Sequence, residues 1–158
     1  MGQEIERKFL VRGNAWRTGA RSERLRQGYL SSSQGCTVRV RIADTVATLT
    51  IKGLPEGITR TEFEYPIPLA DAAIMLNRLC GHPLIDKTRY SVDYAGMRWE
   101  IDEFQGENAG LIVADIELES EAQTFELPPW LGDEVTADPR YQNSRLISHP
   151  FSHWRPDD

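Results

Sequence analysis

The chain has 158 residues, of which 40% are apolar and 27% are charged, a composition typical of a soluble globular protein. Its 18 Lys and Arg against 24 Asp and Glu give a net charge of −6, which argues against binding nucleic acid or an anionic membrane through overall charge. Its two cysteines indicate neither a disulfide framework nor a zinc site and favour a reducing cytoplasm. No signal peptide and no apolar run of about 18 residues is evident, so we expect neither secretion nor a membrane span.

Alternation of apolar and polar residues predicts eight β-strands in one domain over residues 1–158. The predicted strands cover residues 3–11, 22–31, 36–43, 46–53, 58–67, 86–94, 97–104 and 111–119. Between the fifth and sixth strands, apolar residues at helical spacing followed by a glycine predict a helix over residues 69–81. An Asp-Pro start signal predicts a second helix over residues 138–148. We therefore expect an α+β fold in which helices flank a sheet-rich body.

Charged residues recur on one face of most of the predicted strands. In the first strand, Glu4, Glu6 and Lys8 alternate with an apolar face that includes Ile5 and Phe9. Carried through the other strands, this alternation gives nine acidic candidates: Glu4, Glu6, Glu62, Glu64, Glu100, Asp102, Asp115, Glu117 and Glu119. It also gives eight basic candidates: Lys8, Arg39, Arg41, Lys52, Arg60, Lys87, Arg89 and Arg98.

A solvated face of mixed charge would explain any one of these strands, but the repetition favours a shared interior. Two like charges about 4 Å apart cost roughly 4 kcal/mol at an effective dielectric of about 20, so a ligand of opposite charge should offset them. A closed, eight-stranded antiparallel barrel would turn the charged face inward to line a polar tunnel. The apolar face, with residues such as Trp99 and Ile116, would then pack outward.

The acidic and the basic candidates are suited to two different kinds of ligand. Carboxylates are preferred by hard divalent cations such as Mg²⁺ and Mn²⁺, whereas clustered Arg and Lys bind anions with several oxygens, typically phosphates. A divalent metal together with a polyphosphate satisfies both sets.

The order of these motifs resembles the CYTH superfamily, the triphosphate tunnel metalloenzymes. Glu4-x-Glu6-x-Lys8 resembles the ExExK signature of that family. The motifs that follow it are "QGY" at 27–29, "RVR" at 39–41, "TIKG" around Lys52, "RTEFE" at 60–64, "KTR" at 87–89, "EID" at 100–102 and "IELE" at 116–119. The ending "DPRYQNSRL" resembles the short bacterial members, so the resemblance covers essentially the whole chain.

The resemblance implies a tunnel that binds a small-molecule triphosphate with Mg²⁺ or Mn²⁺. The implied metal ligands are Glu4, Glu6, Asp102, Glu117 and Glu119. The implied phosphate-binding residues are Lys8, Arg39, Arg41, Lys52, Arg60, Lys87 and Arg89. The implied catalytic residues are Lys8, Tyr29, Glu62 and Glu64, where Tyr29 either orients water or the leaving phosphate or is a wall residue. Arg140, Tyr141 and Asn143 either close one tunnel mouth or belong to an ordinary terminal helix.

The expected activity is hydrolysis of inorganic tripolyphosphate to pyrophosphate and phosphate, because no organic-group pocket is evident. Thiamine triphosphatase and an adenylate cyclase of the class IV type are the alternative enzymes, although no residue set specifies adenine. A non-catalytic polyphosphate- or nucleotide-binding module is the alternative from another class, and the intact acidic set argues against it. Dimerisation is common in the family, so a homodimer is a further expectation without a residue to support it.

Overall fold

The computed structural model describes residues 2–32 and 35–156. Nine strands run β1 (Gln3–Val11), β2 (Arg21–Ser31), β3 (Cys36–Ala43), β4 (Val46–Gly53), β5 (Thr59–Ile67), β6 (Ile85–Tyr94), β7 (Met97–Phe104), β8 (Ile112–Glu117) and β9 (Leu131–Glu134). The helices are α1 (Leu69–Arg78) and α2 (Asn143–Ser148), with short 3₁₀ turns η1 (Ala15–Arg17), η2 (Gly106–Asn108), η3 (Pro139–Tyr141) and η4 (Phe151–His153).

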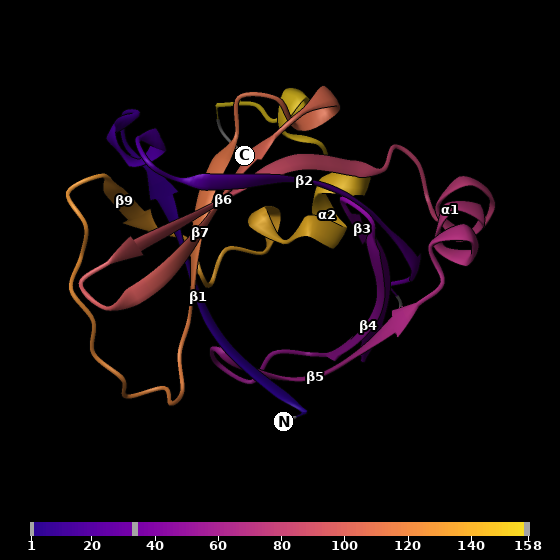
Figure 1. The fold of residues 1–158 in the computed structure, drawn as a ribbon, viewed down its shortest axis with the longest axis horizontal. Coiled ribbons are helices and arrows are strands. Elements are labelled where there is room, and N and C mark those ends of the chain that lie inside the picture. Colours follow the sequence, from indigo (N-terminus) through magenta and orange to yellow (C-terminus); the bar gives the residue numbers. More distant parts are fainter. Residues whose placement is uncertain (1, 33–34, 157–158) are drawn as a thin grey trace.

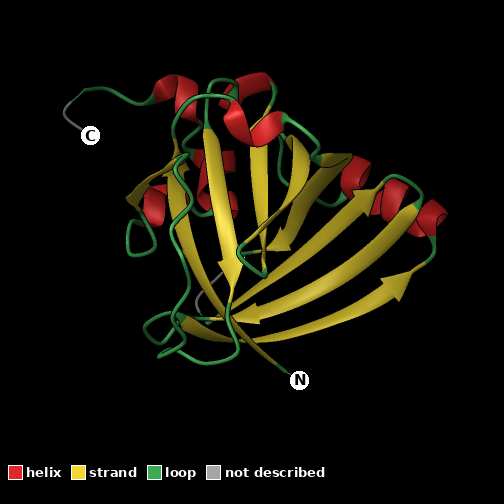
Figure 2. Cartoon of the chain, turned by 60° about the vertical axis from the view of Figure 1, so that its left-hand side comes forward, coloured by secondary structure: helices red, strands yellow, loops and turns green. Residues whose placement is uncertain are grey.

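The first eight strands close into the expected antiparallel barrel. Neighbours follow the order β5-β4-β3-β2-β6-β7-β8-β1, and a further pairing between β1 and β5 completes the circle. The start of β1 pairs with β5, where Glu4 lies opposite Arg60, and its middle pairs with β8, where Lys8 lies opposite Asp115. In Figure 1 the strands surround a central space and α2 is seen across it. Figure 2 shows the same strands from another side, with helical segments gathered near their ends.

Several parts of the prediction differ from the structure. α1 ends at Arg78, before the predicted residue 81, and β8 ends at Glu117, before the predicted residue 119. The short strand β9 was not predicted, because four residues, "LGDE", are too few to show an alternation. It pairs with the second half of β1, where Val11 lies opposite Leu131. The C-terminal helix predicted over residues 138–148 is split into η3 and α2 by Gln142, whose backbone is extended at φ −68° and ψ 133°.

Apolar side chains pack on the outer side of the barrel, as the alternation predicts. Trp99 and Ile116 are fully buried in a cluster that also holds Trp130 and Trp16. On the opposite side, α1 buries Leu76 and other apolar side chains against β3 and β4. Each such side chain contributes about 1.5–3 kcal/mol when fully buried. The core therefore surrounds the barrel and leaves its interior to the polar face of each strand.

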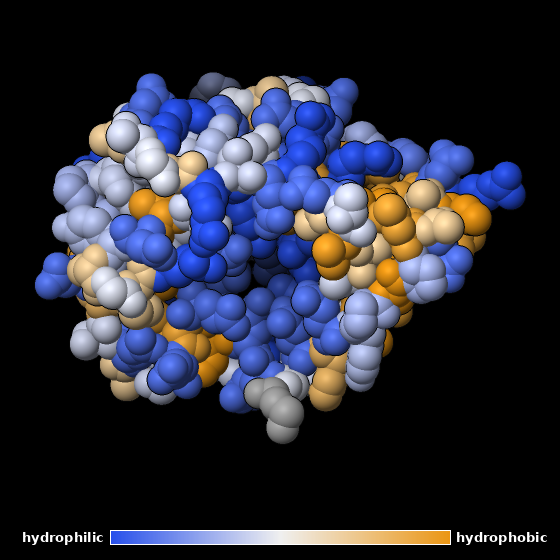
Figure 3. Space-filling model, viewed as in Figure 1, coloured by the Kyte–Doolittle hydropathy of each residue, from blue (hydrophilic) through white to orange (hydrophobic). Residues whose placement is uncertain are grey.

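The apolar cover is incomplete along β5. Phe63 and Tyr65 are 46% and 53% exposed, although the outer apolar face was expected to be covered. Leu69 and Ile74 of α1 are exposed as well, and Figure 3 shows hydrophobic surface over α1 beside the hydrophilic centre. Within the described ranges, no helix has the length and apolar character needed to span a membrane.

Candidate active site

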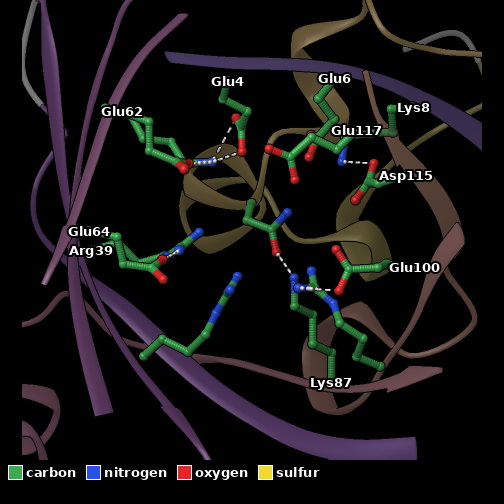
Figure 4. A pocket seen from close by; sticks show the side chains of 14 residues that line it. Glu4, Glu6, Lys8, Arg39, Glu62, Glu64, Lys87, Glu100, Asp115 and Glu117 are labelled. Atoms are coloured by element: carbon green, nitrogen blue, oxygen red, sulfur yellow. Dashed lines mark hydrogen bonds and ion pairs between the residues drawn. The ribbon is translucent and has the colours of Figure 1, made fainter. Parts of the chain in front are cut away.

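The barrel encloses a polar cavity of about 250 Å³, visible as the hydrophilic hollow in Figure 3. Side chains from alternate positions of its strands, together with one from α2, line this cavity: Glu4, Glu6, Lys8, Arg39, Arg41, Lys52, Glu62, Glu64, Lys87, Arg89, Glu100, Asp115, Glu117 and Asn143. Figure 4 shows the labelled members of this set pointing toward one another. Most of the residues expected from the sequence are therefore brought together, the exceptions being Tyr29, Arg60, Arg98, Asp102 and Glu119.

Lys8 and Asp115 form an ion pair between β1 and β8, with Nζ 2.8 Å from Oδ1. Burial and the neighbouring Glu6 raise the pKa of Asp115 to about 6, although Lys8 acts in the opposite direction. Burial lowers the pKa of Lys8, but Asp115 and Glu6 outweigh it and raise that pKa well above its usual value. Lys8 is therefore a permanent cation of the cavity wall.

Asp102 lies behind the cavity wall, fully buried between two basic residues of the neighbouring strand. Its Oδ2 is 2.8 Å from Lys87 Nζ, and its Oδ1 accepts a hydrogen bond of 2.8 Å from Arg89 Nε. Burial raises the pKa of Asp102, but Arg89 and Lys87 outweigh that effect and hold it well below its usual range. Both carboxylate oxygens of Asp102 are thus paired with Lys87 or Arg89. A metal ligand, in contrast, needs a carboxylate oxygen that is free to bind the ion.

The basic side of the cavity is strongly desolvated. Burial, Arg89 and Arg41 lower the pKa of Lys87 to about 7, although Asp102 opposes the shift. Burial, Arg39 and Arg89 likewise lower the pKa of Arg41. The Nε of Arg39 is buried without a hydrogen-bond partner in the part of the chain that the structure describes. These cations repel one another and are only partly neutralised by the protein, so an anion between them would be stabilised.

The acidic side is also incompletely compensated. Lys52 Nζ lies 3.0 Å from Glu4 Oε1 and 3.2 Å from Glu62 Oε2. Burial, Glu4, Glu62 and Glu6 raise the pKa of Glu117, which lies opposite Glu6 in the pairing of β1 with β8. A cluster of carboxylates that raises the pKa of one member has the donor chemistry that a hard divalent cation prefers.

The carboxylates of the cavity do not form a complete metal site by themselves. Among residues 2–32 and 35–156, no three carboxylate, His or Cys side chains converge closely enough to hold a metal ion by themselves. Mg²⁺ commonly binds through one or two carboxylates and completes its octahedron with phosphate oxygens and water. The donor set therefore fits a cation that binds together with a phosphate ligand.

Besides Asp102, four expected residues lie outside the cavity. Arg98 was expected to face inward but is exposed near the turn between β6 and β7, where it lies opposite Asp93 and its Nε is 3.5 Å from Asp93 Oδ1. Tyr29 and Arg60 line a smaller adjoining cavity of about 80 Å³ at the α2 end. Arg60 Nε donates to the carbonyl oxygen of Gly53 at 3.0 Å. Glu119 is exposed beyond the end of β8, where its backbone N–H donates to Gln123 Oε1.

Neutral partners of the charged residues were missed in the sequence. Gln27 Oε1 accepts a hydrogen bond from Arg41 Nε at 2.8 Å, and Thr50 Oγ1 accepts one from Arg39 Nη2 at 3.0 Å. The available signal was their position, because Lys52 follows Thr50, and Tyr29 follows Gln27, two residues along the same strand face. Of the residues expected near a tunnel mouth, Asn143 lines the cavity, Tyr141 is buried beside α2, and Arg140 pairs with Asp138.

A CYTH domain matches residues 2–146, and the chain therefore belongs to the CYTH family. It is similar to an inorganic triphosphatase of Acetivibrio thermocellus, with 46% identity over 98% of this chain and 99% of that protein. It is also similar to an inorganic triphosphatase of Nitrosomonas europaea, with 37% identity over 90% of this chain and 95% of that protein. A solved structure of an inorganic triphosphatase has a TM-score of 0.67 and 35% identity, covering 90% of this chain and 96% of that one.

Proposed function

We propose that this protein is a divalent-metal-dependent triphosphatase that cleaves inorganic tripolyphosphate to pyrophosphate and phosphate. One observation carries the proposal: every side chain that lines the central cavity is polar, with partly compensated cations on one side and crowded carboxylates on the other. The relatives from Acetivibrio thermocellus and Nitrosomonas europaea, both inorganic triphosphatases, support it.

The basic residues of the cavity would bind the phosphates: Lys8, Arg39, Arg41, Lys52, Lys87 and Arg89. Arg60 lies next to Lys52 in the adjoining cavity and would act from there. Asp102 would position Lys87 and Arg89 by pairing with both from behind the cavity wall, which leaves their remaining N–H groups for the ligand. We therefore assign Asp102 to positioning and not to the metal.

Mg²⁺ or Mn²⁺ would be held by Glu6 and Glu117, with Glu4 beside them and phosphate oxygens completing the coordination. The bound metal supplies neutralisation of the phosphate oxygens, which otherwise repel a nucleophile. Glu119 is not assigned to the metal, because it lies outside the cavity.

The remaining residues act by charge and position. Lys8 keeps its proton and so stabilises negative charge on the transferring phosphate. Glu62 and Glu64 orient basic partners, because Glu62 contacts Lys52 and Glu64 lies 3.6 Å from Arg39. Tyr29 contacts Gln27 at 3.5 Å and belongs to the wall of the adjoining cavity.

The test compares phosphate release from tripolyphosphate, thiamine triphosphate and ATP, each with Mg²⁺, Mn²⁺ or EDTA. We expect tripolyphosphate to be preferred and turnover to be lost with EDTA. Glu6→Gln should lose most of the activity, whereas Glu126→Gln, on an exposed segment outside the cavity, should retain it. Tight binding without turnover would instead identify a binding module, and cyclic nucleotide formed from ATP would identify a cyclase.

Thiamine triphosphate is the second candidate substrate, but no aromatic or apolar side chain lines the cavity to hold the thiamine group. The free thiols of Cys36 and Cys80 and the net charge of −6 support a cytoplasmic location without nucleic-acid or membrane partners. The exposed Phe63 and Tyr65 on β5 support a homodimer through that face, which size-exclusion chromatography with light scattering would detect.

A further inference from the structure

Among the described residues that line the charged cavity, Asn143 is the only one with a neutral side chain, and it comes from α2 and not from a barrel strand. Its Oδ1 accepts a hydrogen bond of 2.8 Å from Lys87 Nζ and one of 3.3 Å from Gln27 Nε2. In its ammonium form Lys87 carries donors and no acceptor, so the oxygen of the Asn143 amide faces it. The orientation of this amide is therefore determined by its neighbour.

Gln27 is oriented by the same rule. Arg41 Nε donates to Gln27 Oε1 at 2.8 Å, and a guanidinium also has donors only. The oxygen of Gln27 therefore faces Arg41, and its Nε2 faces Asn143. Arg41, which stays a donor-only cation, thus fixes the direction of Gln27 and, through Gln27 Nε2, that of Asn143. The N–H of Lys87 that points at Asn143 Oδ1 agrees with this direction.

This arrangement leaves the Nδ2 group of Asn143, with two N–H donors, unused by the protein. No hydrogen bond joins it to any residue of the described ranges 2–32 and 35–156, and Asn143 borders the central cavity. A neutral donor beside Lys87 and Arg41 can contact a phosphoryl oxygen without adding to the repulsion among the cations.

The helix that carries Asn143 is held firmly against the barrel. Asn108 is buried between β7 and β8, where its Nδ2 donates to the Leu146 carbonyl oxygen at 3.4 Å. Its Oδ1 accepts from the backbone N–H of Phe151 at 2.8 Å, and Leu146 itself is fully buried. The side chain of Asn108 therefore holds both α2, at Leu146, and the segment that follows it, at Phe151. Asn143 is consequently placed by the fold and not by a mobile tail.

We propose that Asn143 is a substrate-binding residue, whose Nδ2 donates a hydrogen bond to a phosphoryl oxygen of the bound triphosphate at the α2 end of the cavity. This inference rests on the proposed function, because it assumes that the phosphates lie among Lys87, Arg41 and their neighbours. In this proposal α2 contacts the substrate directly, in addition to closing one end of the barrel.

The test uses Asn143→Asp, which keeps an oxygen acceptor for Lys87 and Gln27 but replaces the amide donor by a second oxygen. Asn143→Ala removes both functions. Ser144→Asp is the charge-matched control, because Ser144 is the next residue of α2 and lines the adjoining cavity but not the central one. Tripolyphosphate cleavage with Mg²⁺ is measured for all three, together with their thermal unfolding.

We expect Asn143→Asp to lower kcat/KM about 10- to 100-fold, the loss typical of one hydrogen bond to a charged group, and further than Asn143→Ala. Ser144→Asp should change kcat/KM by less than about threefold. If Asn143 only positions Lys87, Asn143→Asp will restore activity relative to Asn143→Ala. That order, or an effect of Asn143→Asp no larger than that of Ser144→Asp, overturns the proposal.

If the wild-type protein cleaves no tripolyphosphate, the proposed function is wrong. This result is distinct from a failure of the proposal for Asn143. The same variants are then compared by calorimetric titration with tripolyphosphate and Mg²⁺. Affinity falling in the order Ser144→Asp, Asn143→Ala, Asn143→Asp supports the donor role of Asn143, and equal affinities of Asn143→Asp and Ser144→Asp refute it. If Asn143→Asp unfolds, the comparison of Asn143→Ala with wild type decides, with unchanged affinity counting against the proposal.

Discussion

Lys8 of β1 and Asp115 of β8 lie directly opposite each other, and their side chains meet in a 2.8 Å contact between Lys8 Nζ and Asp115 Oδ1. Lys8 is held protonated by this contact, whereas Asp115 titrates near pH 6 despite it. The pair therefore supplies a permanent cation together with a carboxylate that can take up a proton at little cost.

Substitution Lys8→Met should consequently affect function more than stability. We expect kcat/KM for tripolyphosphate to fall about 10- to 100-fold, because one charge-assisted contact to the phosphates is lost. The thermal midpoint should change little, since Asp115 can become protonated once its partner is gone. Steady-state kinetics and thermal unfolding at pH 7 check both outcomes, and retention of activity would exclude Lys8 from the site.

Substitution of Asp102, in contrast to that of Lys8, should lower the stability of the protein. Asp102→Asn leaves Lys87 and Arg89 buried without a counter-charge, so we expect a loss of about 3–5 kcal/mol in the free energy of unfolding. Asp93→Asn, which breaks a 3.5 Å contact between exposed side chains, should cost less than about 0.5 kcal/mol. Urea unfolding measures both.

Added tripolyphosphate should stabilise Asp102→Asn, because the ligand provides the missing negative charge near the two bases. A variant that is as stable as wild type without ligand would show that Asp102 does not neutralise them.

Binding of the polyanion should be linked to proton uptake at Lys87. The pKa of Lys87 is lowered from 10.5 to about 7 in the free protein, so the side chain is mostly neutral at pH 8. A bound phosphate favours the ammonium form and raises this pKa, so binding at pH 8 should take up protons. At pH 6, where Lys87 is already charged, the uptake from this residue should be small.

Calorimetric titrations in buffers of different ionisation enthalpy measure this uptake. Lys87→Arg is the matched variant, because arginine stays charged and should remove the pH 8 uptake. Equal proton uptake in Lys87→Arg and wild type would assign the proton to another group.

Glu117 should show opposite effects on stability and on metal use. Its pKa is raised by burial and by nearby carboxylates, so the charged form is disfavoured in the folded protein. Stability from this group is therefore present below its unfolded pKa and is lost as pH rises through the folded pKa. Without metal, Glu117→Gln should raise the thermal midpoint at pH 7 and flatten its decline above about pH 4.5.

The same substitution should raise the Mg²⁺ concentration needed for half-maximal activity by about tenfold or more, since one carboxylate ligand is lost. Glu119→Gln serves as the control, because Glu119 is exposed outside the cavity. If Glu119→Gln shifts the Mg²⁺ requirement as strongly as Glu117→Gln, the assignment of ligands is wrong.

Much of the site was predictable from local pattern. Because a strand alternates its side chains, residues such as Glu4, Glu6 and Lys8 were assigned to one face from the sequence, and all three line the cavity. The bounds of β1, β3, β4 and β7 also follow this alternation. The position of a residue within a strand, however, does not show whether its side chain is free to contact a ligand or is already paired with a neighbouring side chain.

The sequence by itself determined that charged residues of both signs occupy the inner face of the barrel, and it identified most of those that line the cavity. The tertiary structure decided how those charges pair, because pairing depends on the register between strands. Asp102 lies opposite Arg89 in the pairing of β6 with β7, and this register makes it a partner of bases. Asn143 reaches the cavity only because the chain returns over the barrel end after β9, a contact between residues far apart in sequence that no local period encodes.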